Sequence, residues 1–215
     1  MSSILIAGNT SGTITLDAPA VAGTTTLTLP TTSGTVLTSA SSIPTSQLSG
    51  SISAASLPAG SILQVVSSTK TDTFSTTTTG SWIDVTGLSV SITPTSSSSR
   101  IMIFSRITGA GEAAVTRLQI RLVRDSTAIS IGDASGSRLQ VSGGELYYGG
   151  ENDSLLNSSV SFLDSPATTS STTYKLQIRN GNSNGTIVVN RTRNNNNDNA
   201  TPVATSSITV MEIKG

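Results

Sequence analysis

The sequence contains no cysteine and no histidine, and charged and aromatic residues make up only 11% and 3% of its 215 residues. Without cysteine, neither a disulfide bond nor a thiolate metal site can form. Without histidine, the usual general base and the commonest transition-metal ligand are missing. Conventional Ser-His-Asp and Cys-His catalysis are therefore excluded. We expect a protein that is not an enzyme and that carries no cofactor.

A strong charge of either sign is also lacking, since 12 basic residues balance 12 acidic ones. A balanced chain has no net field to attract nucleic acid or an anionic membrane. The apolar run near the N-terminus is too short for a signal peptide, and no stretch approaches the length of a membrane helix. We expect no nucleic-acid partner and no insertion into a membrane.

Serine and threonine are abundant and supply about a third of the chain. Threonine is β-branched and suits strands, whereas serine and glycine suit turns, so this composition favours an all-β protein. Charge is scarce before Arg100, where Asp17, Lys70, Asp72 and Asp84 are the charged residues. The first hundred residues thus differ chemically from the rest.

Three glycines at a spacing of 11, namely Gly12, Gly23 and Gly34, each open a short stretch that alternates polar and apolar residues. Each stretch predicts a short strand, and none carries enough apolar surface to fold alone. A looser repeat follows in residues 42–60, where each unit holds an isoleucine and a leucine and ends in glycine. We interpret residues 1–60 as an extended arm that must pair with copies of itself or with another surface, with a flexible linker as the alternative for residues 42–60. The apolar residues predicted to mediate attachment or trimerisation are Leu16, Leu27, Leu29, Val36, Leu37, Ile43, Leu48, Ile52 and Leu57.

Sustained alternation begins at Ser61 and continues to the end of the chain. Strands are predicted within residues 61–66, 82–85, 88–93, 100–107, 116–124, 127–131, 158–163, 172–179, 185–190 and 204–213. About ten short strands separated by turns indicate an antiparallel β-sandwich, jelly-roll-like, over residues 61–215. Trp82 is expected in its core, because a single tryptophan in an alternating strand is more often buried than a ligand platform.

Two polar loops are candidate ligand sites. The glycine-rich residues 143–153 include adjacent tyrosines and several carboxylates, and residues 194–199 are almost all asparagine. Exposed aromatic and amide groups suit glycan recognition, although the tyrosines could equally anchor a surface loop. A pair among Asp133, Glu145, Glu151, Asp153 and Asp164 could in principle hydrolyse glycosides, but carboxylates on a flexible loop fit that chemistry poorly. The spacing matches no EF-hand, so no metal site is assigned. The candidate ligand residues are Tyr147, Tyr148, Glu151, Asp153, Asn195 and Asn196.

The chain resembles the fibre and virion structural proteins of tailed phages, notably of aquatic phages. In the arm, the resemblance lies in residues 12–23, 26–30 and 33–38, and in the β-domain it lies in residues 60–66, 82–88 and 174–178. It implies a component of the virion, usually a homotrimer with an N-terminal attachment region.

Two functions remain open at this stage. The first is a short tail fibre, whose arm binds the tail or baseplate and whose β-domain meets a host-surface glycan. The second is a capsid decoration (cement) protein, whose arm lies across neighbouring major capsid subunits by strand addition.

Overall fold

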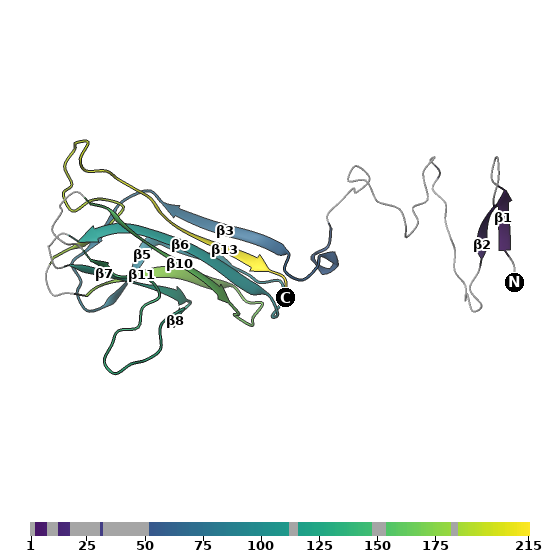
Figure 1. Cartoon of the computed structure of the whole chain (residues 1–215), viewed down its shortest axis with the longest axis horizontal. Helices are drawn as coiled ribbons and strands as arrows, with labels where there is room; N and C mark the ends of the chain where they lie inside the picture. Colours follow the sequence, from purple (N-terminus) through teal and green to yellow (C-terminus); the bar gives the residue numbers. More distant parts are fainter. Residues whose placement is uncertain are drawn as a thin grey trace. The chain divides into compact units, whose positions relative to one another are not determined.

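The described part of the chain folds into β-strands whose side chains alternate between two faces. The computed structural model describes residues 3–7, 13–17, 31, 52–111, 116–147, 154–181 and 185–215. Its contacts divide the chain into two units, Met1–Ser51 and Ile52–Gly215 (Figure 1).

The first unit contains an antiparallel hairpin formed by β1 (Ser3–Ala7) and β2 (Thr13–Asp17), with Ser3 opposite Asp17 and Ala7 opposite Thr13. The strand predicted after Gly12 is confirmed as β2, whereas β1 was not predicted. Backbone pairing places Leu16 opposite Ile4. The other arm residues of this unit fall outside the described residues, namely Leu27, Leu29, Val36, Leu37, Ile43 and Leu48.

The second unit is built from two antiparallel sheets. The first, here called sheet I, contains β3 (Ile62–Lys70), β4 (Phe74–Thr76), β6 (Arg100–Gly111), β10 (Leu156–Asp164), β12 (Ile187–Val189) and β13 (Ser206–Ile213). Sheet II contains β5 (Trp82–Ile92), β7 (Arg117–Arg124), β8 (Thr127–Ile129), β9 (Leu146–Tyr147) and β11 (Thr172–Asn180).

The strand order is that of a jelly roll. Along sheet I, β13 and β12 pair with successive parts of one edge of β6, β10 pairs with its other edge, and β3 and β4 form the outer row. Along sheet II the order is β5, β11, β7, with β8 and β9 sharing the last edge. When strands that lie end to end are taken as one, the positions in chain order read 1-8-3-6 in sheet I and 2-7-4-5 in sheet II. This double Greek key confirms the predicted all-β, jelly-roll-like sandwich.

The core lies between the two sheets and follows from the alternation of each strand. On β11 the residues Thr172, Tyr174, Leu176, Ile178 and Asn180 are buried, and the residues between them are more exposed. Strands of sheet I contribute Ile101, Ile103, Ile208 and Val210, which are all completely buried. Burial of this apolar surface is the main source of stability.

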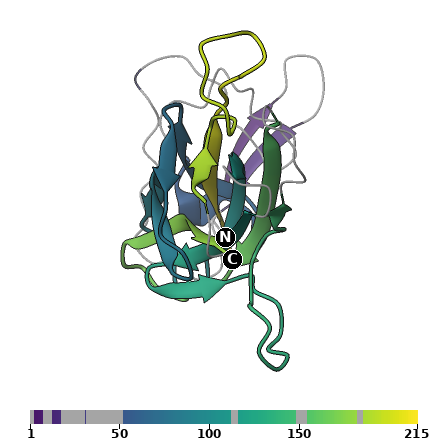
Figure 2. The same cartoon turned by 90° about the vertical axis from the view of Figure 1, so that its left-hand side faces the viewer.

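Each end of the sandwich collects a different set of connections. Residues 52–61, the loop of residues 93–99 and the C-terminus meet at one end, here called the junction end. The described connections after β4 (residues 77–81) and after β12 (residues 190–205) lie at the opposite end, here called the loop end, which faces the viewer in Figure 2.

Two expectations about β5 need correction. The segments 82–85 and 88–93 form one strand, in which Gly87 adopts a φ of +87° beside a bulge opposite β11. Trp82 does not lie in the core, because Ile83 pairs with the buried Ile178 and Trp82 therefore points to the outer face of sheet II. Its ring lies under the Arg121 guanidinium, whose carbon is 4.5 Å from the ring centroid.

Candidate functional site: an apolar sheet face beside the junction end

The outer face of sheet I carries an apolar patch that crosses every strand row of the sheet. Val65, Met211, Met102 and Leu163 are successive partners on β3, β13, β6 and β10. Their neighbours along each strand point into the sandwich, so these four side chains share the outer face. Ile62, Phe104 and Ile213 extend this row toward both sides. We call these seven residues the apolar face.

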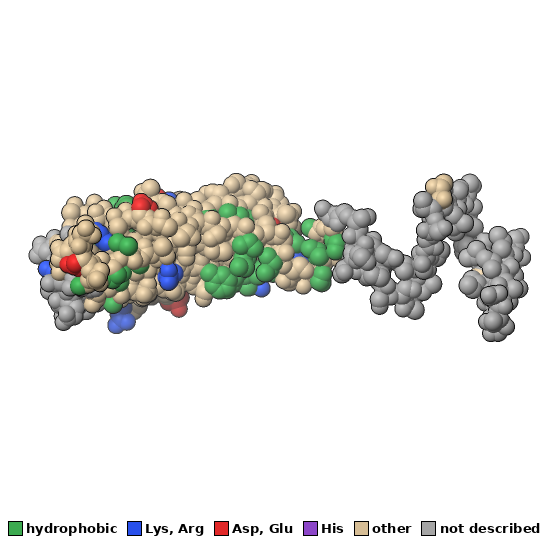
Figure 3. Space-filling view, turned by 90° about the horizontal axis from the view of Figure 1, so that it is seen from above, with side chains coloured by type: hydrophobic (Ala, Val, Ile, Leu, Met, Phe, Trp, Pro, Cys, Tyr) green, Lys and Arg blue, Asp and Glu red, His purple; other side chains and the backbone are tan. Residues whose placement is uncertain are grey.

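Much of the apolar face is accessible in the single chain. Ile62, Val65 and Phe104 are 56%, 53% and 46% exposed, and the other four side chains are partly exposed. Figure 3 shows hydrophobic side chains gathered over β3 and β13 on the side toward the junction end. Contiguous apolar surface of this kind marks contact sites between proteins.

A shallow hollow of about 290 Å³ adjoins the apolar face on its side toward the loop end. Its lining combines the exposed ring of Phe104 with Arg106 and small hydroxyl side chains of β10 and β13. Ser67 and Thr209 share a hydrogen bond of 2.9 Å on the same face. The outer side of sheet I is therefore apolar near the junction end and hydroxyl-rich beyond it.

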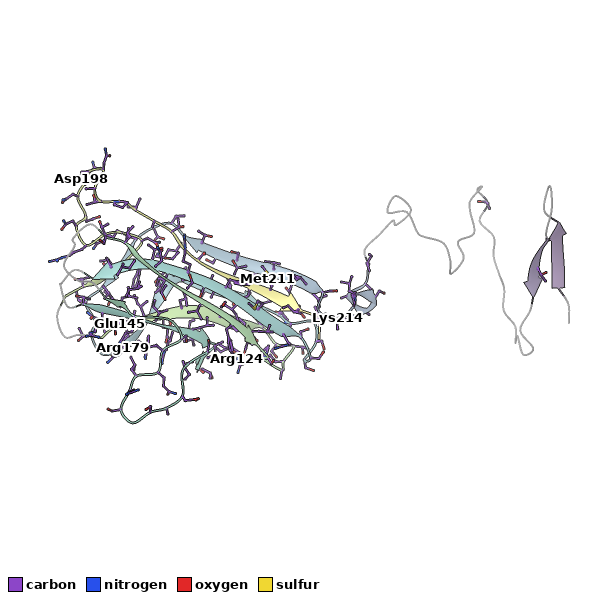
Figure 4. The ribbon with its side chains drawn as sticks, viewed as in Figure 1. Arg124, Glu145, Arg179, Asp198, Met211 and Lys214 are labelled. Atoms are coloured by element: carbon purple, nitrogen blue, oxygen red, sulfur yellow. The ribbon has the colours of Figure 1, made fainter. Side chains whose placement is uncertain are left out.

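The junction end is held by the last residues of the chain. Lys214 donates from Nζ to the carbonyl oxygens of Ala55 (3.0 Å) and Leu57. Its backbone oxygen accepts from the Gly60 N–H at 2.8 Å, and its own N–H donates to the Ser61 oxygen at 2.9 Å. The short 3₁₀ turn η2 (Ala54–Ser56) is thus fixed against β13. Lys214 lies at this end in Figure 4.

Of the predicted attachment residues, two fall in this described segment. Ile52 is 58% exposed, and Leu57 is half-buried after η2. Both lie in residues 52–60, which the sequence placed in the arm and which here belong to the second unit. The exposed Ile52 adds apolar surface at the end where the apolar face begins.

A buried carboxylate organises the same end of the sandwich. Glu212 is completely buried and accepts four hydrogen bonds. Its Oε1 accepts from Thr95 N, Thr95 Oγ1 and Ser99 Oγ, each at 2.7 Å, and its Oε2 accepts from Gln64 Nε2 at 2.6 Å. The loop of residues 93–99 is thereby tied to β13 and β3.

Among the described residues Glu212 forms no ion pair, so these donors stabilise its charge. Burial raises the pKa of Glu212, but hydrogen bonds from Ser99, Gln64 and Thr95 lower it more, so the pKa lies below its ordinary value. The carboxylate is ionised at neutral pH and acts as a structural anchor.

A second buried carboxylate joins the two sheets. Asp164 of sheet I accepts from Arg124 Nη1 through both oxygens at 2.9 Å and from the Tyr174 hydroxyl at 2.7 Å. Burial, together with the hydrogen bond to Asp164, raises the pKa of Tyr174 above its ordinary value. Arg124 and Tyr174 both belong to sheet II, so this cluster fastens one sheet to the other.

The described carboxylates considered for glycoside hydrolysis do not converge. Asp164 ends β10 at the junction end, whereas Glu145 precedes β9 at the loop end and pairs with Arg117 at 2.8 Å. Asp133 is exposed in the connection between β8 and β9. Glu151 and Asp153 lie outside the described residues.

The predicted ligand residues map to the loop end where the structure describes them. Asn195 and Asn196 are exposed in the connection between β12 and β13, and Figure 4 shows Asp198 of this loop opposite Lys214. The backbone of Tyr147 pairs with Arg117 in β9. Tyr148, Glu151 and Asp153 fall outside the described residues.

Within the described ranges, no group of three or more acidic, histidine or cysteine side chains is placed to hold a metal ion. In the same ranges, no helix is long and apolar enough to cross a membrane.

With this geometry established, the chain can be compared with known proteins. No family model matches it, and no curated protein matches it. Among solved structures, the chain is similar to a protein chain in the structure of infectious bursal disease virus, Gx strain, with 17% identity and a TM-score of 0.35. That alignment covers 72% of this chain and 42% of the viral chain. The chain thus spans less than half the length of that viral chain.

The apolar face and the buried Glu212 were not predicted from the sequence, although the sequence of β13 contains a signal for both. In β13 the residues Thr209, Met211 and Ile213 share one face, while Ile208, Val210 and Glu212 share the other. A strand that is apolar on both faces predicts a second contact surface, and a glutamate in phase with Ile208 and Val210 predicts a buried carboxylate.

Proposed function

We propose that this chain is a non-enzymatic structural protein of a virion, that it works as a homotrimer, and that it forms a short tail fibre. In this proposal residues 1–51 attach to the tail or baseplate. The sandwich forms the distal part and turns its loop end toward the host surface. The sequence resemblance to phage fibre proteins supports the location in the virion.

The observation that carries the proposal is the position of the apolar face beside the junction end. Three copies whose apolar faces meet would bring their Ile52 residues, and the arms that precede them, to one place. The arm would then gain from the other copies the partners that its short strands need. The loop ends would remain free.

Burial of the apolar face between copies can stabilise an oligomer. Completing the burial of Ile62, Val65 and Phe104, each about half exposed, would contribute about 1 kcal/mol per side chain. The contribution is multiplied over three copies, and the arm strands add their own pairing. Stable interfaces combine an apolar centre of this kind with a polar rim, which the hydroxyl-rich part of sheet I would supply.

A single charge tests the interface. Val65→Glu places a carboxylate in the centre of the apolar face, so we expect native mass spectrometry to show single chains where the unaltered protein shows trimers. The matched control is Thr86→Glu, at an exposed position of β5 in sheet II, which should leave the trimer intact. Circular dichroism should show the same β-content in both variants. If Val65→Glu remains a trimer, the apolar face is not the interface.

Location in the particle is tested by copy number. A tail fibre should be present in a few dozen copies at most, measured by quantitative gel densitometry of purified particles, and antibodies against it should block adsorption to host cells. Hundreds of copies would instead identify a capsid decoration protein. Absence of the chain from purified particles would overturn the virion assignment itself.

A further inference from the structure

The outer face of sheet II is chemically unlike the apolar face. Three neighbouring strands of this sheet present Arg117, Gln119 and Arg121 from β7, Lys175, Gln177 and Arg179 from β11, and Trp82 and Asp84 from the edge strand β5. Register places Trp82, Arg179 and Gln119 in one cross-strand row and Asp84, Gln177 and Arg121 in the next. These residues form what we call the polar face.

Each row is ordered by a glutamine that links an acid to an arginine. Gln177 donates to Asp84 Oδ1 at 2.6 Å and accepts from Arg121 Nε at 2.7 Å. In the adjacent row, Gln119 donates to Glu145 Oε2 at 3.0 Å and accepts from Arg179 Nη1 at 2.7 Å. Each amide bonds through both its oxygen and its nitrogen, so the two arginines are held in defined orientations.

Arg121 is the best-positioned donor on this face. Its guanidinium stacks over Trp82, and its Nε is held by Gln177. Within the described ranges, its two Nη groups have no protein partner. A planar guanidinium fixed in this way keeps a two-pronged donor open and has little conformational freedom to lose on binding.

Charge on the polar face favours an anion. Four cations, Arg117, Arg121, Lys175 and Arg179, share the face with two acids, Asp84 and Glu145. This excess of two positive charges is too small for the multiple phosphate contacts by which proteins bind nucleic acid, and the whole chain has no net charge. The acids and amides on the face can accept hydrogen bonds from hydroxyl groups, which sugars provide and phosphate backbones largely lack.

We propose that the polar face binds an acidic polysaccharide and that Arg121 donates hydrogen bonds to a sugar carboxylate through its two Nη groups. This inference rests on the proposed function, because it takes the ligand to be a host-surface polymer that the distal sandwich of a tail fibre would meet, and it places that ligand on sheet II. The neighbouring Lys175 and Arg179 add attraction along the polymer. Weak binding at each face is strengthened by the three copies of a trimer.

The probe is polygalacturonate, a linear polymer of sugar carboxylates, with dextran as the neutral counterpart and a single-stranded DNA oligonucleotide as the phosphate counterpart. Isothermal titration calorimetry on the full chain should show binding of polygalacturonate that weakens as salt rises, and no binding of dextran. Stronger binding of the DNA, or equal binding of dextran, would overturn the proposal.

Three variants locate the site. Arg121→Gln should weaken polygalacturonate binding at least about tenfold. Arg121→Lys keeps the charge but lacks the planar fork, so it should also weaken binding several-fold. Arg138→Gln removes the same charge from an exposed position between β8 and β9 and should change affinity less than about twofold. Equal affinities for all three variants and the unaltered chain would exclude the polar face. Native mass spectrometry separates this outcome from a failure of the proposed function, because the Arg121 variants should remain trimeric.

Discussion

Glu212 should make a large and pH-dependent contribution to the stability of the sandwich. In Glu212→Gln the amide oxygen can still accept from Thr95 and Ser99, but these bonds lose the assistance of a full charge. The new amide nitrogen faces Gln64 Nε2, a second donor that is already committed to the Thr93 carbonyl at 2.8 Å. Hydrogen bonds to a charged group are worth about 1.5 to 3 kcal/mol each, and part of each survives in the variant. We expect the free energy of unfolding to fall by about 2 to 3 kcal/mol.

Urea denaturation of the full chain at fixed protein concentration measures this difference, with tryptophan fluorescence from Trp82 as the signal. Glu145→Gln is the matched control, because the same substitution there removes one surface ion pair, with Arg117, and should cost less than about 1 kcal/mol. Equal losses in the two variants would contradict the role assigned to Glu212.

The pH dependence gives a second, independent check. Because the pKa of Glu212 is lower in the folded chain than its ordinary value of 4.5, the folded state favours the ionised form. Its contribution is therefore complete above pH 4.5 and is lost as the pH falls through the folded pKa. The stability difference between the unaltered chain and Glu212→Gln should be constant at neutral pH and should shrink in acid. A difference that stays constant down to pH 2 would show that the carboxylate charge is not involved.

Two further substitutions test the joining of the sheets and the close approach of β6 to β12 within sheet I. Asp164→Asn removes the carboxylate charge to which Arg124 and Tyr174 both donate. Because Arg124 is partly exposed, we expect the free energy of unfolding, measured by urea denaturation, to fall by about 2 to 4 kcal/mol. A loss below about 0.5 kcal/mol would show that this cluster is dispensable. Gly109→Ala would place a methyl carbon 2.5 Å from the Val188 carbonyl oxygen, so it should lower Tm by several degrees, whereas Gly132→Ala meets open space and should leave Tm unchanged within about a degree.

The strands of the sandwich could be predicted from the sequence because each one alternates with a period of two over several residues. The segments 100–107, 172–179 and 204–213 correspond to β6, β11 and β13 with small shifts at their ends. The short strands β4 and β9 were missed, since three and two residues give no measurable alternation. These two strands form by backbone pairing with β12 and β7, which lie far away in the sequence. The local sequence therefore gives no signal for them.

The position of Trp82 shows that the alternation of a strand, and not the residue type alone, decides whether a side chain points into the core. A lone tryptophan is usually buried, which led to the expectation of a core position. In β5, however, Trp82 lies two residues from Asp84 and so shares its face, while Ile83 and Val85 share the opposite one. The side chain is therefore directed outward, where Arg121 covers it.

The candidate surfaces were less predictable because they combine residues from distant strands. Val65, Met102, Leu163 and Met211 meet only through the order β3, β13, β6, β10, and that order follows from the jelly-roll topology. The Asp84–Gln177–Arg121 row likewise depends on the register of β5, β11 and β7. The sequence shows which residues are apolar or charged, but it does not show the strand pairing that brings these residues together.

The mass of the full chain in solution tests the central proposal most directly. Native mass spectrometry at micromolar concentration should give three times the single-chain mass of 21.8 kDa, and Val65→Glu should reduce it to one chain. A single chain in the unaltered protein, with the sandwich folded, would contradict the account of the apolar face as the surface on which this protein assembles.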